Sequence, residues 1–217
     1  MAKYFTTVNE FKYSWDQVAA GFWQRYPNPY SKHVLSEDVV DRKVADNKLY
    51  TKRLLTKTNH MPKWGEKIVP GPKYVALVEE SVVDPKAKTL TTYTRNVGYT
   101  RLMSVVEKCI FKVDEKNSKW SQVERYAWID SNVIGVGGAI KHFGMERFKH
   151  NVNKACKGFE YVLDNLYPGL NQVAQDTGTM AARKEKLAET AKKAKEIAKA
   201  KASRPITANC SGQAASS

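Results

Sequence analysis

Residues 22–35 read FWQRYPNPYSKHVL, and this stretch decides how the rest of the chain is arranged. Pro27 and Pro29 each lack a backbone donor, and each disfavours the helical conformation in the residue before it. A helix that enters the stretch must therefore end near the first proline, and the chain leaves as an extended corner. Two interpretations stay open. The corner either serves packing alone, or holds Arg25 and His33 toward an anionic group inside the protein.

The segment before the corner has the pattern of a strand followed by a helix. Alternating side chains in residues 3–12 predict the strand, and Ser14 with Gln17 has the spacing of a capping box. Apolar residues then recur at spacings of three and four, which predicts one broad helical face. That face comprises Trp15, Val18, Ala19, Phe22, Trp23 and Tyr26. Arg25 lies about 80–100° from its middle, so we expect the arginine at the border of the core.

Six further segments have strand-like composition and are joined mainly by short polar turns, as hairpins require. They are residues 33–44, 49–58, 73–83, 90–96, 102–113 and 119–129. With residues 3–12 they make seven strands, most of them joined as a meander. We interpret this order as an α+β fold in which one face of an antiparallel sheet is covered.

The connection at residues 60–72, HMPKWGEKIVPGP, is longer than a hairpin and holds three prolines and two glycines. It places Met61, Trp64, Ile68 and Val69 among Lys63 and Lys67. Such a segment is either an Ω-loop packed on its own body or a mobile lid. A lid would insert apolar side chains into a membrane while its lysines meet anionic headgroups.

A second long helix is predicted from Ser131 or Asn132 to about Tyr167. Its apolar stripe comprises Phe148, Val152, Ala155, Phe159, Val162 and Leu166. Beside that stripe lie Arg147, Asn151 and Lys154, at i, i+4 and i+7. They form either a solvated border or, if they face a cavity, an anion clamp.

The formal net charge is +14, and residues 173–217 contribute nine Lys and Arg against four Asp and Glu. This balance favours nucleic acid, an anionic membrane or a phosphate-bearing ligand, and composition cannot choose among them. Residues 181–202 are almost wholly Ala, Lys, Glu and Arg, which predicts a helix with little apolar surface for docking. We therefore expect a folded domain at residues 1–170 and a basic helical tail at 171–217 that ends in a disordered segment.

No motif for catalysis or metal binding is visible, so the sequence gives an enzyme no support. The histidines show no metal-ligand spacing, and the carboxylates lie mainly at strand positions that we expect to be solvated. We expect Cys109 and Cys156 to be buried thiols and Cys210 to be a loose tail residue. No apolar run approaches a membrane span and no secretory signal is visible, which predicts a soluble protein.

Five stretches carry a family resemblance: FWQRYPNPYSKHVL, RLLTKTNHMPKW, SVVDP, TTYTRN and ERFKHNVNKACKGFEYVL. Over residues 1–166 they resemble the PRELI-like family of mitochondrial phospholipid-transfer proteins, in the same order and at similar spacing. The Lys/Ala-rich tail is similar to that of the animal members. The resemblance implies a curved seven-stranded antiparallel sheet with helices over its concave face, enclosing a lipid-binding tunnel.

The resemblance also implies a function. Members work in the mitochondrial intermembrane space as a heterodimer with a small twin Cys-x9-Cys helical protein. The branch most similar to this chain carries phosphatidic acid from the outer to the inner membrane, supplying cardiolipin synthesis, and a related branch carries phosphatidylserine. It implies contact with an anionic membrane surface, bound phospholipid as cargo, no cofactor and no nucleic acid.

Residue by residue, the resemblance assigns the lipid headgroup to Arg25, His33, Lys57, Arg147, Asn151 and Lys154. It assigns the lid and membrane contact to Met61, Lys63, Trp64, Ile68 and Val69. Where the family has a further basic residue just before the lid, this chain has His60, and Lys63 is the candidate substitute. A desolvated phosphate monoester carries about −1.5 to −2 charges and needs such partners. Two acyl chains need an apolar hollow, since exposing roughly thirty CH₂ groups costs about 24 kcal/mol.

Nucleic-acid binding through the basic surface is the rival from another class. It predicts aromatic side chains exposed among the cations, as on a stacking platform. Trp15, Phe22 and Trp23 instead fall on the predicted core face, and the basic tail has no aromatics. A third interpretation is a structural protein that binds anionic membranes and extracts no lipid.

Overall fold

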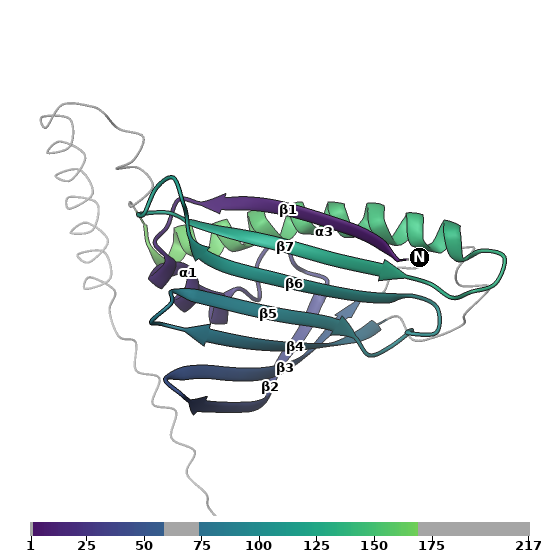
Figure 1. Cartoon of the computed structure of the whole chain (residues 1–217), viewed down its shortest axis with the longest axis horizontal. Coiled ribbons are helices and arrows are strands. Elements are labelled where there is room, and N and C mark those ends of the chain that lie inside the picture. The colour runs from purple at the N-terminus through teal and green to yellow at the C-terminus, as the bar shows by residue number, and fades with distance from the viewer. Residues whose placement is uncertain (1, 59–73, 169–217) are drawn as a thin grey trace, which may run out of the picture. The chain divides into compact units, whose positions relative to one another are not determined.

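The computed structural model describes residues 2–58 and 74–168, whose arrangement Figure 1 shows. The chain divides into two compact units, Met1–Asn171 and Gln172–Ser217, and every described residue belongs to the first. Its strands are β1 (Lys3–Phe11), β2 (Val34–Ala45), β3 (Lys48–Thr58), β4 (Tyr74–Asp84), β5 (Thr89–Asn96), β6 (Ser104–Val113) and β7 (Ser121–Asp130). The helices are α1 (Trp15–Gly21), the 3-10 helix η1 (Phe22–Gln24) and α3 (Gly137–Leu166).

The seven strands form one antiparallel sheet in the order β1-β7-β6-β5-β4-β3-β2, which confirms the predicted meander. The first strand completes the sheet by pairing with the last one, from Lys3 opposite Ile129 to Phe11 opposite Ser121. The sheet is curved, and α1 and α3 cover its concave face, with α3 running along β1 and β7 (Figure 1). The predicted α+β class is confirmed.

Turn chemistry explains where several strands begin and end. Asp46 and Asn47 both have left-handed backbones, with φ of 50° and 57°, as a two-residue hairpin turn requires. β6 begins two residues later than predicted. The backbone N–H groups of Leu102 and Met103 both donate to the carbonyl of Tyr99 at 2.9 Å, so those residues close a turn.

The predicted capping box is present at the start of α1. The Ser14 hydroxyl accepts from the backbone N–H of Gln17 at 3.4 Å, and the Gln17 side chain accepts from the Ser14 N–H at 2.9 Å. Trp15, Val18 and Phe22 of the predicted apolar face are buried. The helical turns thus end just before Arg25, which places that side chain at the edge of the core.

Asn28 holds the corner between η1 and β2. Its side-chain amide donates to the carbonyl of Arg25 at 2.7 Å and accepts from the N–H of Tyr30 at 2.9 Å. The prolines stop the helix, as predicted, and a buried asparagine then fixes the chain's direction.

The predicted start of the long helix was wrong. α3 begins at Gly137, with Val136 as its N-cap and no side-chain capping bond, rather than at Ser131 or Asn132. Ser131 is engaged elsewhere, since its hydroxyl donates to the carbonyl of Leu102 at 2.6 Å. The apparent cap residue therefore links the end of β7 to the turn before β6.

The two faces of the sheet have different environments. A buried cluster between the sheet and the helices includes Phe11, Phe22, Phe111, Phe159 and Leu163. On the opposite face Tyr4, Val8 and Trp128 are exposed. Within residues 2–58 and 74–168, the inward-facing side of the sheet is therefore covered by the helices and the corner.

Candidate functional site

A cavity of about 300 Å³ is enclosed by the inner face of the sheet, the corner after η1 and α3. Its apolar lining includes Leu55, Leu77, Val105, Ile140, Phe143, Phe148, Val152 and Phe159. This volume lies at the lower end of the roughly 300–1,000 Å³ typical of ligand pockets. The site is therefore a partly open hollow with a largely apolar wall.

Strand register arranges the cavity wall in rows of different character. One row pairs Arg53 with Glu79, Glu79 with Thr94, and Thr94 with Glu107 across four strands. The next row along the strands is mainly apolar and contains Leu55, Leu77, Asn96, Val105 and Ile129. In the other direction the wall ends in the aromatic core around Phe111. A charged row therefore separates a closed apolar end from an apolar compartment.

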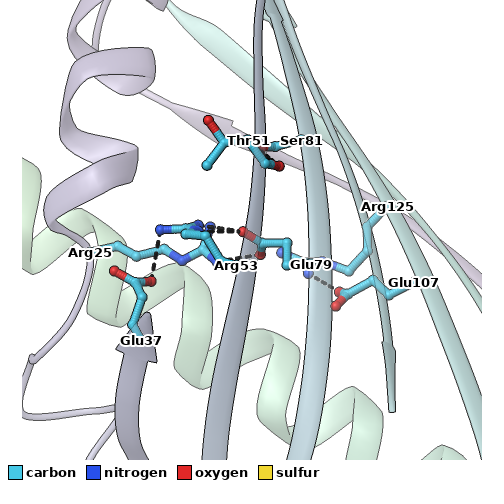
Figure 2. A network of polar contacts seen from close by, with 8 residues as sticks. All are labelled: Arg25, Glu37, Thr51, Arg53, Glu79, Ser81, Glu107 and Arg125. Carbon is cyan, nitrogen blue, oxygen red and sulfur yellow. Dashed lines mark hydrogen bonds and ion pairs between the residues drawn. The ribbon is translucent and has the colours of Figure 1, made fainter. Parts of the chain in front are cut away.

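We call this charged row and the side chains paired to it the polar belt. Figure 2 shows its charged members from close by, together with Thr51 and Ser81. Its members are Arg25, Glu37, Arg53, Glu79, Thr94, Glu107 and Arg125. Three arginines balance three glutamates, so the belt carries no net charge with all six groups ionised.

Glu79 bridges two arginines at the centre of the belt (Figure 2). Its Oε2 forms an ion pair with Arg25, while its Oε1 accepts from Arg53, including an Nε donation at 3.0 Å. Arg53 Nη1 also lies 2.8 Å from Glu37 Oε2. Each of these three side chains thus has a defined partner: Arg53 on β3, Glu79 on β4 and Arg25 in the corner.

Burial and charge act in opposite directions on this cluster. Burial opposes ionisation of Glu79, but Arg25 and Arg53 outweigh it and lower the pKa of Glu79. Burial likewise opposes the charge of Arg25, yet Glu79 raises the pKa of Arg25 above its usual value. The pair is therefore ionised at neutral pH, with the two charges stabilising each other.

A separate ion pair, Arg125 with Glu107, completes the belt on β6 and β7. Arg125 lies opposite Cys109 in the strand register. Burial raises the pKa of Cys109 to about 12, so this thiol stays protonated at neutral pH. Cys109 and Cys156 are both buried and free, as predicted, whereas Cys210 lies outside the described residues.

The predicted headgroup residues fall into two groups. Arg25 belongs to the polar belt, and its side chain is only 14% exposed. His33, Lys57, Arg147 and Asn151 line the same cavity and are not members of the belt. Lys154 is exposed and does not line the cavity, although its charge acts on His33. The structure brings five of the six residues to one cavity wall.

We call His33, Lys57, Arg147, Asn151 and Lys154 the basic rim. Burial, and then the charges of Lys57, Lys154 and Arg147, lower the pKa of His33 to about 4. His33 is therefore neutral at pH 7. Within the described residues, no carboxylate lies within ion-pair distance of Lys57 or Lys154. Lys57 and Lys154 therefore give the rim an excess of positive charge, in contrast to the balanced belt.

The predicted lid and membrane-contact residues, Met61, Lys63, Trp64, Ile68 and Val69, lie outside the described residues, as does His60. The predicted tail helix at residues 181–202 also lies outside them. Their assigned roles stay predictions.

The expectation that the carboxylates are solvated was wrong for Glu79, Glu107 and Glu37, which the belt buries or half-buries. Sequence periodicity carried a usable signal. Glu79 is in phase with the inward-facing Leu77, just as Arg53 is in phase with Leu55. A charged residue in phase with apolar inward positions marks a buried ion pair or a ligand contact.

Among the described residues, no group of His, Cys, Asp and Glu is arranged to hold a metal ion. In the same part of the chain, no helix combines the length and the hydropathy needed to cross a membrane. His142 and His150 are exposed on α3. The chemistry of the site is therefore that of arginine, lysine and amide groups beside an apolar wall.

This combination of fold and site is that of a binding protein with a partly apolar, partly cationic cavity between a curved sheet and a long helix. A family model, PRELI-like family, matches residues 16–168. The chain belongs to the PRELI-like family of mitochondrial lipid-transfer proteins.

Relatives along most of the chain agree with this assignment. "PRELI domain-containing protein 1, mitochondrial" of Gallus gallus is 50% identical over 202 residues, covering 92% of this chain and 88% of its own. The protein of that name in Homo sapiens is 49% identical, with 92% and 87% covered. "Protein UPS1, mitochondrial" of Saccharomyces cerevisiae is 34% identical over 155 residues, with 71% and 89% covered. The protein is mitochondrial.

Solved structures at low identity share the fold. The Zhui aromatase/cyclase from Streptomyces matches with a TM-score of 0.54 at 6% identity, covering 77% of this chain and 98% of its own. A protein of Thermus thermophilus matches with a TM-score of 0.53 at 16% identity, covering 76% and 99%. At these identities the likeness concerns architecture alone.

Proposed function

We propose that the protein carries phosphatidic acid from the outer to the inner mitochondrial membrane and so supplies cardiolipin synthesis. The observation that supports this most is the meeting of two chemistries in one cavity. Apolar side chains form most of the wall, while Arg25, Lys57 and Arg147 contribute cationic groups to it. A phospholipid with an anionic headgroup has this same division.

Charge supports the headgroup assignment. A phosphate monoester with about −1.5 to −2 charges is strongly disfavoured in an apolar medium unless it is paired. The basic rim has the charge excess to pair with it, while the neutral His33 and the amide of Asn151 add hydrogen bonds. Arg25 adds a planar fork suited to bidentate binding of phosphate oxygens.

The acyl chains of the cargo require the apolar part of the cavity wall. Removing two chains from a bilayer without cover costs on the order of 24 kcal/mol, so a carrier must provide an apolar surface instead. The apolar row of Leu55, Leu77 and Val105 supplies part of it. In this proposal, residues 60–71 act as the lid that contacts the anionic membrane surface, with Trp64 inserting among the headgroups.

The proposal extends to the protein's setting. The protein acts in the intermembrane space, as a heterodimer with a small twin Cys-x9-Cys helical protein, and the bound phospholipid is cargo rather than a cofactor. No enzymatic activity is part of the proposal, and burial keeps the thiol of Cys109 on the cavity wall protonated, so this thiol is a poor nucleophile.

The test is mass spectrometry of the lipid that co-purifies with the full chain expressed together with the small cysteine-rich protein. We expect phosphatidic acid, and transfer of phosphatidic acid between vesicles in the same preparation. Co-purified phosphatidylserine with matching transfer would assign the chain to the phosphatidylserine branch. Binding of anionic vesicles without extraction, or RNA bound at moderate salt, would overturn the carrier function.

A further inference from the structure

The central relationship in the cavity is that Arg25 is already occupied. The ion pair with Glu79 engages one terminal nitrogen of the planar fork that a phosphate would bind. We propose that Glu79 is the internal competitor of the cargo phosphate for Arg25, and that this competition limits affinity enough to permit release. This inference rests on the proposed function, because it names what opposes cargo binding at the same site.

Arg25 needs a counterion when no cargo is bound. Its guanidinium carbon lies 4.0 Å from the ring centroid of Phe22 and 5.0 Å from that of Tyr26, so aromatic faces hold it away from water. A buried guanidinium without a partner would be strongly destabilising. Glu79 on β4, itself 4% exposed, supplies the opposite charge.

Glu79 can give up Arg25 without becoming an unpaired buried charge. One of its carboxylate oxygens serves Arg25 and the other serves Arg53, which lies directly opposite on β3. After a phosphate takes Arg25, the bond to Arg53 stays in place, and Arg53 also keeps Glu37 at 2.8 Å. The exchange therefore replaces one charge-assisted contact by another and leaves no bare ion in the protein.

Arg25 also has an unused donor on the side chain. Its Nε is buried and has no hydrogen-bond partner among the described residues. A phosphate presents several acceptor oxygens, so it can satisfy this Nε while it displaces Glu79 from the terminal nitrogen. A phosphate can thus make a hydrogen bond with Arg25 that Glu79 does not make. This extra bond favours replacement of Glu79 by the phosphate when cargo is present.

The Glu79 carboxylate and the cargo phosphate are both negatively charged, so Glu79 opposes phosphate binding even if its side chain moves little. A phosphate within hydrogen-bond reach of Arg25 lies within a few ångströms of the Glu79 carboxylate, and two anions at such a distance repel each other. Removing the charge of Glu79 would change the polar belt from neutral to one net positive charge. Anionic cargo should then bind more tightly and leave more slowly, whereas zwitterionic cargo should respond much less.

The chain offers a matched control on the next residue. Glu80 lies on the opposite face of β4 and forms a half-exposed ion pair with Lys52 at 3.1 Å. Glu79→Gln and Glu80→Gln make the same chemical change on the same strand, inside and outside the cavity. Glu79→Asp serves as a second variant: its shorter carboxylate stays with Arg53 across the strand pair and draws back from Arg25, so a buried charge remains paired.

The experiment measures dissociation constants of the full chain for dioctanoyl phosphatidic acid and dioctanoyl phosphatidylcholine by tryptophan fluorescence. Dissociation rates are measured by stopped flow, and thermal melting reports folding. We expect Glu79→Gln to bind phosphatidic acid about tenfold more tightly, mainly through slower dissociation. Glu79→Asp should fall between it and the native chain. Glu80→Gln should lie within about twofold of the native chain.

The outcomes separate this inference from the proposed function. If the native chain binds phosphatidic acid in an Arg25-dependent manner, and the folded Glu79→Gln and Glu79→Asp variants bind it no more tightly, Glu79 is structural and the inference is wrong. An equal gain for phosphatidylcholine would also overturn it, because competition for Arg25 is specific to anionic cargo. If the native chain shows no saturable binding of phosphatidic acid, or Arg25→Gln binds it unchanged, the proposed function itself fails.

Discussion

Gly158 of α3 lies directly against the side chain of Asn28 in the corner. A Cβ built at Gly158 would come within 2.5 Å of Asn28 Oδ1 and 2.9 Å of its Nδ2. Asn28 is 8% exposed and holds Arg25 and Tyr30 through hydrogen bonds, so it has little freedom to retreat. The absence of a side chain on the helix thus permits the corner, and with it Arg25, to sit where it does.

Gly158→Ala should therefore destabilise the protein, although alanine has the higher helix propensity. Overpacking a tight contact costs about 1–3 kcal/mol, which exceeds the propensity gain of about 1 kcal/mol. Urea denaturation measures the change. Gly138→Ala, in the first turn of the same helix, is the control because its Cβ would meet nothing within 4 Å. Equal stability of the two variants would show that the corner can move away.

Arg25→Gln should reduce phosphatidic acid transfer between vesicles by about tenfold or more, because a charge-assisted bidentate contact is lost. The fold should persist, since Glu79 keeps Arg53 as its partner. Arg95→Gln makes the same change on the exposed side of β5 and should leave transfer unchanged. Full transfer by Arg25→Gln would remove this residue from the headgroup site.

Lys57→Gln should weaken phosphatidic acid binding more than Lys154→Gln does. Lys57 lines the cavity, where its charge is less screened, whereas Lys154 is exposed to solvent and to salt. We expect about a tenfold loss for Lys57 and less than about threefold for Lys154, measured as dissociation constants. The control is Lys52→Gln, whose side chain lies on the outer face of the same strand and pairs with Glu80. Equal losses at positions 57 and 154 would contradict a cavity-based site.

His33 should make stability fall as the pH is lowered. Its pKa is about 4 in the folded protein and about 6.5 in the unfolded chain, so the unfolded chain binds more protons between these values. The folded state is therefore disfavoured progressively from about pH 6.5 down to about pH 4. After discounting for the partial exposure of His33, the loss is at most about 2 kcal/mol.

His33→Gln should flatten this part of the pH dependence, measured as the free energy of unfolding in urea from pH 7 to pH 4. His150→Gln, on an exposed part of α3, controls for the removal of any histidine. A His33→Gln curve parallel to that of the native chain would show that His33 is protonated without penalty at the cavity wall.

Local patterns in the sequence were enough to predict the elements and their order. Alternation, turn residues, the capping box at Ser14 and the two prolines of the corner act over a few residues, so a linear pattern contains them. The family could also be recognised from the sequence, because the corner and the long helix resemble those of the PRELI-like proteins. The start of α3 was misjudged, since Ser131 has the chemistry of a cap but hydrogen-bonds to a distant turn.

The roles of the charged residues in the cavity emerge from the tertiary structure. Arg25 is 54 residues from Glu79, and Glu79 is 26 residues from Arg53, so their mutual neutralisation depends on strand register and on the corner's position. The sequence placed Arg25 at the edge of a core and, through the resemblance, near a headgroup. It could not tell that the arginine already holds a carboxylate, because an ion pair depends on distances that local patterns do not encode. Because of that ion pair, a cargo phosphate must compete with Glu79 for Arg25.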